Sequence, residues 1–196
     1  MAKKEIKNGC HLYPMPVVIV GANKGGRANF MTAAFCGMMN IRPPVVALGL
    51  ELHHFTTAGI LENGTFSVNL PSTAMMKVTD FCGLVSGNKV DKSGLFKVFY
   101  GKLETAPMIE ECPLTMECKF LQKVDFAPDG AFLGEVTAVY CDDEYMDGKL
   151  PDIAKLDPLI FSMGDNSYWS IGKKLGTAWS IGKKLGTAWS IGKGYK

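Results

Sequence analysis

Short runs of β-branched and aromatic residues follow one another along most of this chain, and each is bounded by glycine, proline, asparagine or aspartate. This pattern is typical of β-strands joined by turns. The runs span residues 17–21, 45–50, 65–70, 114–121, 132–140 and 159–163, with a weaker one at 97–103. So many short strands predict a mainly β protein.

Two segments between these runs have helical patterns. Residues 55–62 carry apolar side chains at helical spacing and are followed by Asn63-Gly64, a typical helix C-cap. Residues 72–83 follow Pro71 and have similar spacing, so we expect a second helix that begins at Ser72 and ends at Gly83. Short strands with two interspersed helices predict a closed or partly closed antiparallel barrel with a few peripheral helices.

The composition is that of a single globular domain. The chain has 196 residues, of which 47% are hydrophobic and 20% charged, and its net charge is only +2. This balance argues against disorder and provides no basic surface of the kind that binds nucleic acid. The first residues are polar, and no apolar run approaches the roughly 18 to 20 residues that cross a bilayer. We therefore expect a cytoplasmic protein that contacts no membrane.

The C-terminal segment repeats itself. Residues 169–178 recur unchanged as 179–188, and a truncated third copy begins at Trp189. Solenoid proteins use longer repeats, so a duplicated segment or a sequence artefact explains the pattern better than a repeat fold. We predict one domain over residues 1–168, followed by a tail over 169–196 that packs on the domain or extends from it.

The cysteines and histidines suggest neither disulfides nor a metal centre. A chain of this size and apolar content does not need disulfide bonds. No Cys-x-x-Cys pair is present, and the three histidines do not complete a metal site with Cys112 and Cys118. We expect reduced, mostly buried thiols and no metal. The residues concerned are Cys10, Cys36, Cys82, Cys112, Cys118, Cys141, His11, His53 and His54.

Three segments carry groups that suit a small anionic ligand. Residues 29–35 follow a Gly-Gly turn and combine small side chains with one amide and one hydroxyl. Residues 82–92 gather Gly, Ser, Asn and Lys in one loop, as an anion site does. Residues 53–57 lie where a strand meets a helix, whose N-terminal amides favour an anion and which Thr56 can cap. Taken singly, the three segments also fit an edge strand, a solvated turn and a plain N-cap.

Together and in this order, these segments resemble the flavin reductase-like, FMN-binding split-barrel family, and within it the flavoredoxins. The resemblance runs from about Tyr13 to Tyr168 and rests on the joint order and spacing of short motifs. These are Pro14-Met15-Pro16-Val17-Val18, Asn29-Phe30-Met31-Thr32-Ala33-Ala34, Arg42-Pro43-Pro44, His54-Phe55-Thr56, Phe66-Ser67-Val68-Asn69, Cys82-Gly83-Leu84-Val85-Ser86-Gly87 with Asp91-Lys92, and Gly134-Glu135-Val136.

The resemblance implies a homodimer of split β-barrels, each holding FMN noncovalently near the subunit interface. The positions that it assigns to the flavin ring and its surroundings are Asn29, Met31, Thr32, Ala33, Ala34 and Phe35. The positions that it assigns to the ribityl phosphate are Thr56, Ser86 and Lys92, with His54 where a basic residue often stands, and Gly87 is a further cofactor-binding position. It also implies that Asp91 orients Lys92 or the loop. Phe35 departs from the family, which often has Trp there, and Ala131 stands where some members have His.

The resemblance implies that the flavin performs the redox chemistry, so we expect no catalytic side chain. We expect an FMN-dependent oxidoreductase or electron-transfer flavoprotein. It would take electrons from NAD(P)H or a redox protein and pass them to a small acceptor or a partner protein. One alternative is an FMN store or sensor without turnover. Another is a split barrel that holds haem or a deazaflavin.

Overall fold

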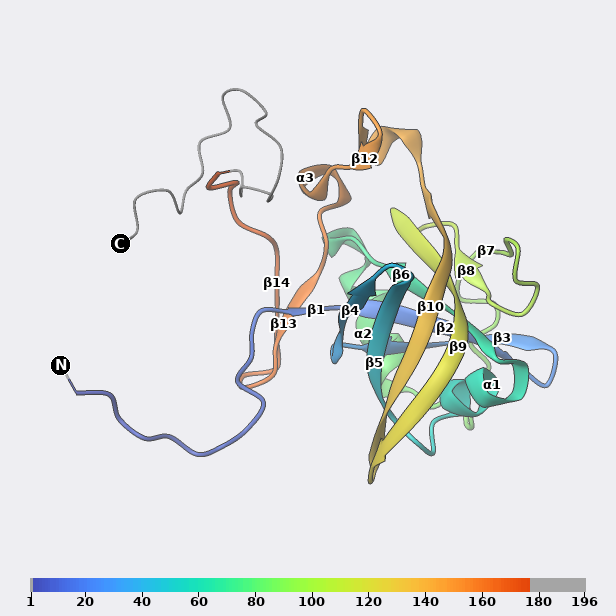
Figure 1. Ribbon diagram of the computed structural model, residues 1–196, viewed down its shortest axis with the longest axis horizontal. Helices are drawn as coiled ribbons and strands as arrows, with labels where there is room; N and C mark the ends of the chain where they lie inside the picture. The colour runs from blue at the N-terminus through green and yellow to red at the C-terminus, as the bar shows by residue number, and fades with distance from the viewer. Residues whose placement is uncertain (1, 177–196) are drawn as a thin grey trace.

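The computed structural model describes residues 2–176, and its largest element is a seven-stranded antiparallel sheet (Figure 1). The order across the sheet is β3 (Arg27–Ala33), β2 (Val18–Lys24), β6 (Thr65–Leu70), β9 (Leu114–Phe126), β10 (Asp129–Cys141), β5 (Pro44–Glu51) and β4 (Cys36–Ile41). Only Ala34 and Phe35 connect the two edge strands, β3 and β4. A two-residue connection spans about 10 Å at most. The sheet must therefore coil until the end of β3 lies near the start of β4. The prediction of a mainly β protein is confirmed.

The strand pairings agree with the predicted turns. Lys24 pairs with Arg27 across Gly25 and Gly26, whose φ angles are +57° and +76°. Two residues with positive φ form the tight hairpin turn for which glycine is suited. β9 and β10 pair as one long hairpin. β2 extends beyond the predicted end at Gly21 to reach the Gly-Gly turn, and β4 was not predicted at all.

Side-chain alternation produces two cores. Val18, Val20 and other inward residues of the sheet pack with Phe66 and Phe132 inside the barrel. Ile19 alternates to the other face and packs in a second cluster with Phe30, Cys82, Phe96, Ile109 and Cys112. This second core fixes the end of a helix and the segment after it against the outer face of β2 and β3.

Both predicted helices are present, with different bounds. α1 spans Phe55–Asn63 and ends at Gly64, whose backbone N–H donates to the Ile60 carbonyl at 2.8 Å, as the C-cap signal predicted. α2 spans Met76–Leu84 and follows a 3₁₀ turn, η1, at Thr73–Met75. The predicted start at Ser72 and end at Gly83 are therefore wrong. Gly83 lies within α2 where the helix packs on β3, and a Cβ there would lie 3.3 Å from that of Thr32.

Smaller elements surround the barrel. A three-stranded sheet of β1 (Met15–Pro16), β13 (Ile160–Ser162) and β14 (Ser167–Trp169) projects from one side in Figure 1. The remaining short elements are β7 (Val98–Phe99), β8 (Met108–Ile109), η2 (Asp143–Tyr145), β11 (Met146–Asp147), β12 (Leu150–Pro151) and α3 (Ile153–Leu156). Of the weak strand predicted at 97–103, only the two residues of β7 form a strand.

The first residue of the predicted tail, Trp169, pairs with Ile160 in the small sheet. Most of the repeated segment, residues 177–196, lies outside the described residues. Within residues 2–176 the cysteines form no disulfide, and Cys82, Cys112 and Cys118 are buried. In the same range, no helix has the length and apolar character needed to cross a membrane.

Candidate functional site

A cavity of about 120 Å³ lies where β3, the start of α1 and the loop after α2 meet. It brings together residues from all three segments that the sequence singled out. Its lining residues are Met31, Thr32, His54, Phe55, Thr56, Cys82, Gly83, Leu84, Val85, Ser86, Gly87 and Lys92. The predicted phosphate residues Thr56, Ser86 and Lys92 are therefore neighbours in the fold, together with His54 and Gly87.

Lys92 is a buried cation in the wall of this cavity. The residue is 2% exposed, and its ammonium donates to the carbonyls of Cys82 at 3.1 Å and Val85 at 2.7 Å. An ammonium has three N–H donors, so one remains for a ligand. No carboxylate of residues 2–176 forms an ion pair with Lys92, and burial lowers the pKa of its ammonium. Because a buried charge without a counter-ion is costly, this arrangement suits an anionic ligand.

Asn29 supports the cavity from behind. It is 3% exposed, and its side-chain amide donates to the Thr56 hydroxyl oxygen at 2.6 Å. Gly87 passes close to it, since a Cβ on Gly87 would lie 2.5 Å from the Asn29 Oδ1 atom. A hydroxyl that accepts one hydrogen bond can still donate its own hydrogen. Asn29 thus orients Thr56 as a donor, while its predicted contact with a flavin ring stays a prediction.

Replacing Thr56 by valine tests this support. Valine keeps the shape of the side chain but leaves the buried Asn29 amide without its acceptor. We expect the free energy of unfolding of the ligand-free protein to fall by about 1 to 2 kcal/mol in urea denaturation. Thr56→Ser keeps the hydroxyl and serves as the control. Equal stability of the valine variant and the parent would show that the Asn29–Thr56 bond contributes nothing.

α1 begins at the cavity, where Phe55 and Thr56 lie in its first turn. The main-chain amides of a first turn lack partners within the helix and favour an anion. His54 occupies the N-cap position with extended backbone, so the prediction that Thr56 caps the helix is wrong. His54 Nδ1 is buried and has no hydrogen-bond partner among residues 2–176. Burial lowers the pKa of His54, and the nearby Glu51 carboxylate partly opposes this effect.

The loop after α2 is held by its own polar groups. The Ser86 hydroxyl accepts a hydrogen bond from the Asn88 backbone N–H at 3.2 Å. Asp91 accepts from the Ser93 backbone N–H at 2.9 Å and from the Arg27 guanidinium at 2.7 Å. Asp91 therefore orients the loop, one of its two expected roles, and the Cys82 and Val85 carbonyls orient Lys92. The sequence motifs did not predict the role of these carbonyls, because every residue type has a main-chain carbonyl.

The remaining predicted residues separate into three environments. Met31 and Thr32 line the cavity, and the Thr32 hydroxyl donates to the Thr79 carbonyl of α2. Ala33 packs in the barrel core. Ala34 and Phe35 line a second, wider pocket together with Pro14, Met15, Pro16 and Cys36. The predicted ring-binding segment thus runs from the cavity, through the core, to this wider pocket.

Cys82 adds a neutral thiol to the cavity. Burial raises the pKa of Cys82 to about 11, although the nearby Lys92 ammonium opposes the shift. The thiolate is the nucleophilic form of cysteine, and it is scarce at neutral pH when the pKa is this high. Cys82 therefore contributes an apolar wall and a main-chain carbonyl.

Comparison with known proteins agrees with this geometry. The flavin reductase-like domain matches residues 10–167. The chain belongs to this family. A flavoredoxin from Methanosarcina acetivorans is 49% identical, with a TM-score of 0.89 over 94% of this chain and 100% of that one. The flavoredoxin of Desulfovibrio vulgaris (Miyazaki F) is 32% identical, with a TM-score of 0.85 over 93% of this chain and 100% of that one.

A protein of Aeropyrum pernix with no described function is 30% identical over 141 residues. The match covers 70% of this chain but only 53% of that protein, so the present chain corresponds to about half of it. Together, the family and the solved structures confirm the predicted split-barrel fold. They also support a flavin-binding redox role for this member of the flavin reductase-like family.

Proposed function

We propose that this protein is an FMN-dependent oxidoreductase or electron-transfer flavoprotein of the flavoredoxin type. It takes electrons from NAD(P)H or a redox protein and passes them to a small acceptor or a partner protein. The observation that carries the proposal is the buried Lys92 ammonium, which lacks a carboxylate partner among residues 2–176 and lies in one cavity with the first turn of α1. This is a donor set for a phosphate monoester. The 49% identity to a flavoredoxin supports FMN as its source.

The size of the cavity decides which part of FMN it receives. A volume of about 120 Å³ is well below the roughly 300 to 1,000 Å³ of a pocket that encloses a whole ligand of this kind. We assign the phosphate end to the cavity. We assign the ring to the wider pocket lined by Ala34 and Phe35, which the connection between β3 and β4 supplies.

FMN supplies the electron and hydride chemistry when bound, so the chain needs no acid, base or nucleophile of its own. Its residues bind and orient. Lys92 balances the phosphate charge, and the Thr56 and Ser86 hydroxyls donate to phosphate oxygens. Thr32 holds α2 against β3 through its bond to Thr79. With FMN bound, the main-chain amides of Ala34 and Phe35, which line the wider pocket, would stabilise negative charge on the ring.

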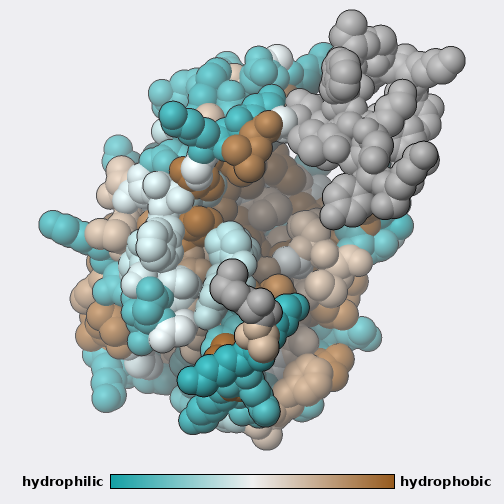
Figure 2. Space-filling view, turned by 90° about the vertical axis from the view of Figure 1, so that its left-hand side faces the viewer, coloured by the Kyte–Doolittle hydropathy of each residue, from teal (hydrophilic) through white to brown (hydrophobic). Residues whose placement is uncertain are grey.

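We also propose a homodimer. β4 is an edge strand and exposes Met38 (56%), Met39 (63%) and Ile41 (84%). Exposed apolar side chains along a free sheet edge favour burial against another chain. Figure 2 views the side from which β1, β13 and β14 project, and it shows hydrophobic residues gathered in a hollow near its centre. A second copy that covers this side would enclose the wider pocket, whereas one chain leaves it open.

The absorption spectrum of the purified protein, followed by anaerobic titration with NADH and NADPH, tests the proposed function. We expect a yellow protein whose bound FMN is bleached by one of these donors or by a reduced redox protein. Bound FMN that no donor reduces would instead indicate a store or sensor. A haem or deazaflavin spectrum would contradict the assignment of FMN.

A further inference from the structure

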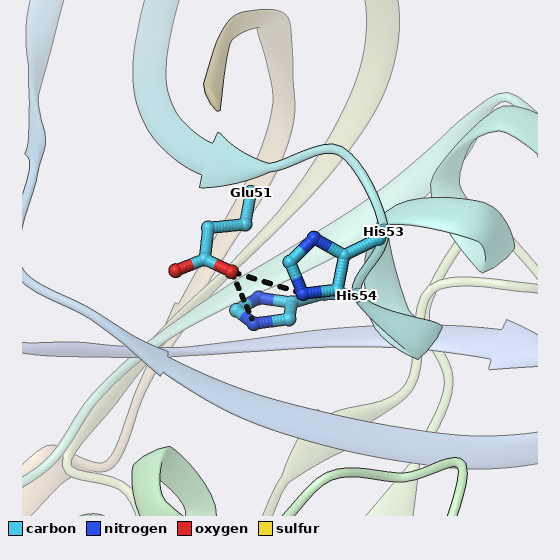
Figure 3. Close-up of side chains that lie close together, drawn as sticks. All are labelled: Glu51, His53 and His54. Carbon is cyan, nitrogen blue, oxygen red and sulfur yellow. Dashed lines mark ion pairs between the residues drawn. The ribbon is translucent and has the colours of Figure 1, made fainter. Parts of the chain in front are cut away.

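Three potential metal ligands converge beside the cavity. Glu51 ends β5, and His53 and His54 follow in the turn that leads to α1 (Figure 3). The Glu51 Oε2 atom lies 3.1 Å from His53 Nε2 and 3.2 Å from His54 Nε2, and the three ligand atoms all lie within 4.8 Å of one another. We propose that Glu51, His53 and His54 bind a divalent first-row transition-metal cation such as Zn²⁺.

The distances suit a common ion. Imidazole nitrogen and carboxylate oxygen bind Zn²⁺ at about 2.0 to 2.2 Å, so two ligands at octahedral or tetrahedral angles lie about 2.8 to 3.6 Å apart. Both separations to Glu51 are in this range. Two imidazoles with one carboxylate favour Zn²⁺, Fe²⁺, Co²⁺ or Ni²⁺, whereas Mg²⁺ and Ca²⁺ prefer sites built from oxygen alone. The ligand set therefore selects the class of cation.

The turn that carries the ligands is fixed by main-chain contacts. The Glu51 carbonyl accepts from the buried Thr57 hydroxyl at 3.0 Å and from the His54 backbone N–H at 3.3 Å. The backbone N–H of Leu52 donates to the Pro128 carbonyl at 3.1 Å, which ties the turn to the β9–β10 hairpin. Because the backbone is already ordered, a cation needs to order only the side chains.

The cluster is open to solvent, and the charged groups near it have opposite effects on the binding of a cation. The His53 side chain is 72% exposed, so a cation can enter and keep water as further ligands. Asp129 is the cross-strand partner of Glu51 and adds negative charge, while Lys92 opposes a cation from the side of the cavity. The Glu51 carboxylate and the two imidazoles form the 2-His-1-carboxylate ligand set of an open site.

His54 links the cation site to the cavity, which it also lines. A neutral imidazole that binds a cation through Nε2 carries its hydrogen on Nδ1. In His54, Nδ1 is buried without a partner among residues 2–176, so cation binding fixes it as a donor beside an anion site. The cation and the flavin phosphate should then affect each other's affinity. This coupling rests on the proposed function, whereas the cation site does not.

Calorimetric titration of tag-free, chelator-treated full-length protein with Zn²⁺, in excess Mg²⁺, tests the site. We expect one saturable site and at least about tenfold weaker binding in both His53→Ala and Glu51→Gln. His53 does not line the cavity, so its variant should retain flavin. His11→Ala and Cys10→Ser are the controls, because they remove the third histidine and an exposed thiol elsewhere.

Three results would overturn the site: no saturable Zn²⁺ binding to the parent, unchanged affinity in His53→Ala, or loss of binding in His11→Ala. Flavin titration with Zn²⁺ or with chelator then measures the coupling. Zn²⁺ binding by a protein that holds no flavin would leave the cation site standing and reject the proposed function. Flavin binding without Zn²⁺ binding would reject the cation site and leave the proposed function standing.

Discussion

Lys92→Met is expected to weaken FMN binding by about ten- to a hundredfold. Methionine keeps a long apolar side chain in the buried position but removes the ammonium. A charge-assisted hydrogen bond contributes about 1.5 to 3 kcal/mol, which corresponds to this loss of affinity. The loss of affinity should be near a hundredfold, because Lys92 is 2% exposed and water screens its charge little.

Titration of ligand-free protein with FMN, followed by quenching of flavin fluorescence, measures the change. Lys89→Met is the matched control, since Lys89 is an exposed lysine of the same loop and should retain the affinity of the parent. Urea denaturation without FMN separates a loss of binding from a loss of folding. If the folded Lys92→Met variant holds FMN as tightly as the parent, the cavity does not hold the phosphate.

Local patterns in the sequence predict much of the fold. Gly25-Gly26 indicates a tight turn because both residues adopt positive φ, and Gly64 ends α1 for the same reason. β4 was not predicted because its sequence shows no alternation of apolar and polar residues. Its place at the edge of the sheet follows from the coiling of the whole barrel, which a local pattern does not record. The sequence likewise did not show that α2 continues past Gly83, where the helix packs on Thr32 of β3.

The sequence singled out several residues that line the candidate cavity, but not their contacts. Thr56, Ser86 and Lys92 come from three motifs, and only the fold shows that they share a cavity with His54. The position of Asn29 behind Thr56 depends on strand register, because a shift by one residue would turn its side chain to the other face. The contact of His53 and His54 with Glu51 depends on the turn after β5, whose conformation the sequence does not specify.

A second large effect is expected in the barrel core, where Gly134 of β10 faces Phe66 of β6. A Cβ on Gly134 would lie 2.2 Å from Phe66 Cζ and 2.5 Å from its Cε1. The Phe66 ring is fully buried among the core residues and has little room to move away. We expect Gly134→Ala to lower the free energy of unfolding by about 3 kcal/mol, the upper end of the usual cost of overpacking. Urea denaturation of the ligand-free protein measures it.

A double-mutant cycle shows whether this collision is the cause. Phe66→Leu removes the two ring atoms that the new methyl group would strike, at the cost of some core packing. The double variant should therefore be more stable than the sum of the two single changes predicts, by at least about 1 kcal/mol. Gly94→Ala is the control, because no atom lies within 4 Å of a Cβ at Gly94. Strict additivity, or a Gly134→Ala variant as stable as Gly94→Ala, would mean that the core admits the methyl group without a collision and that the Phe66 ring does not require glycine at position 134.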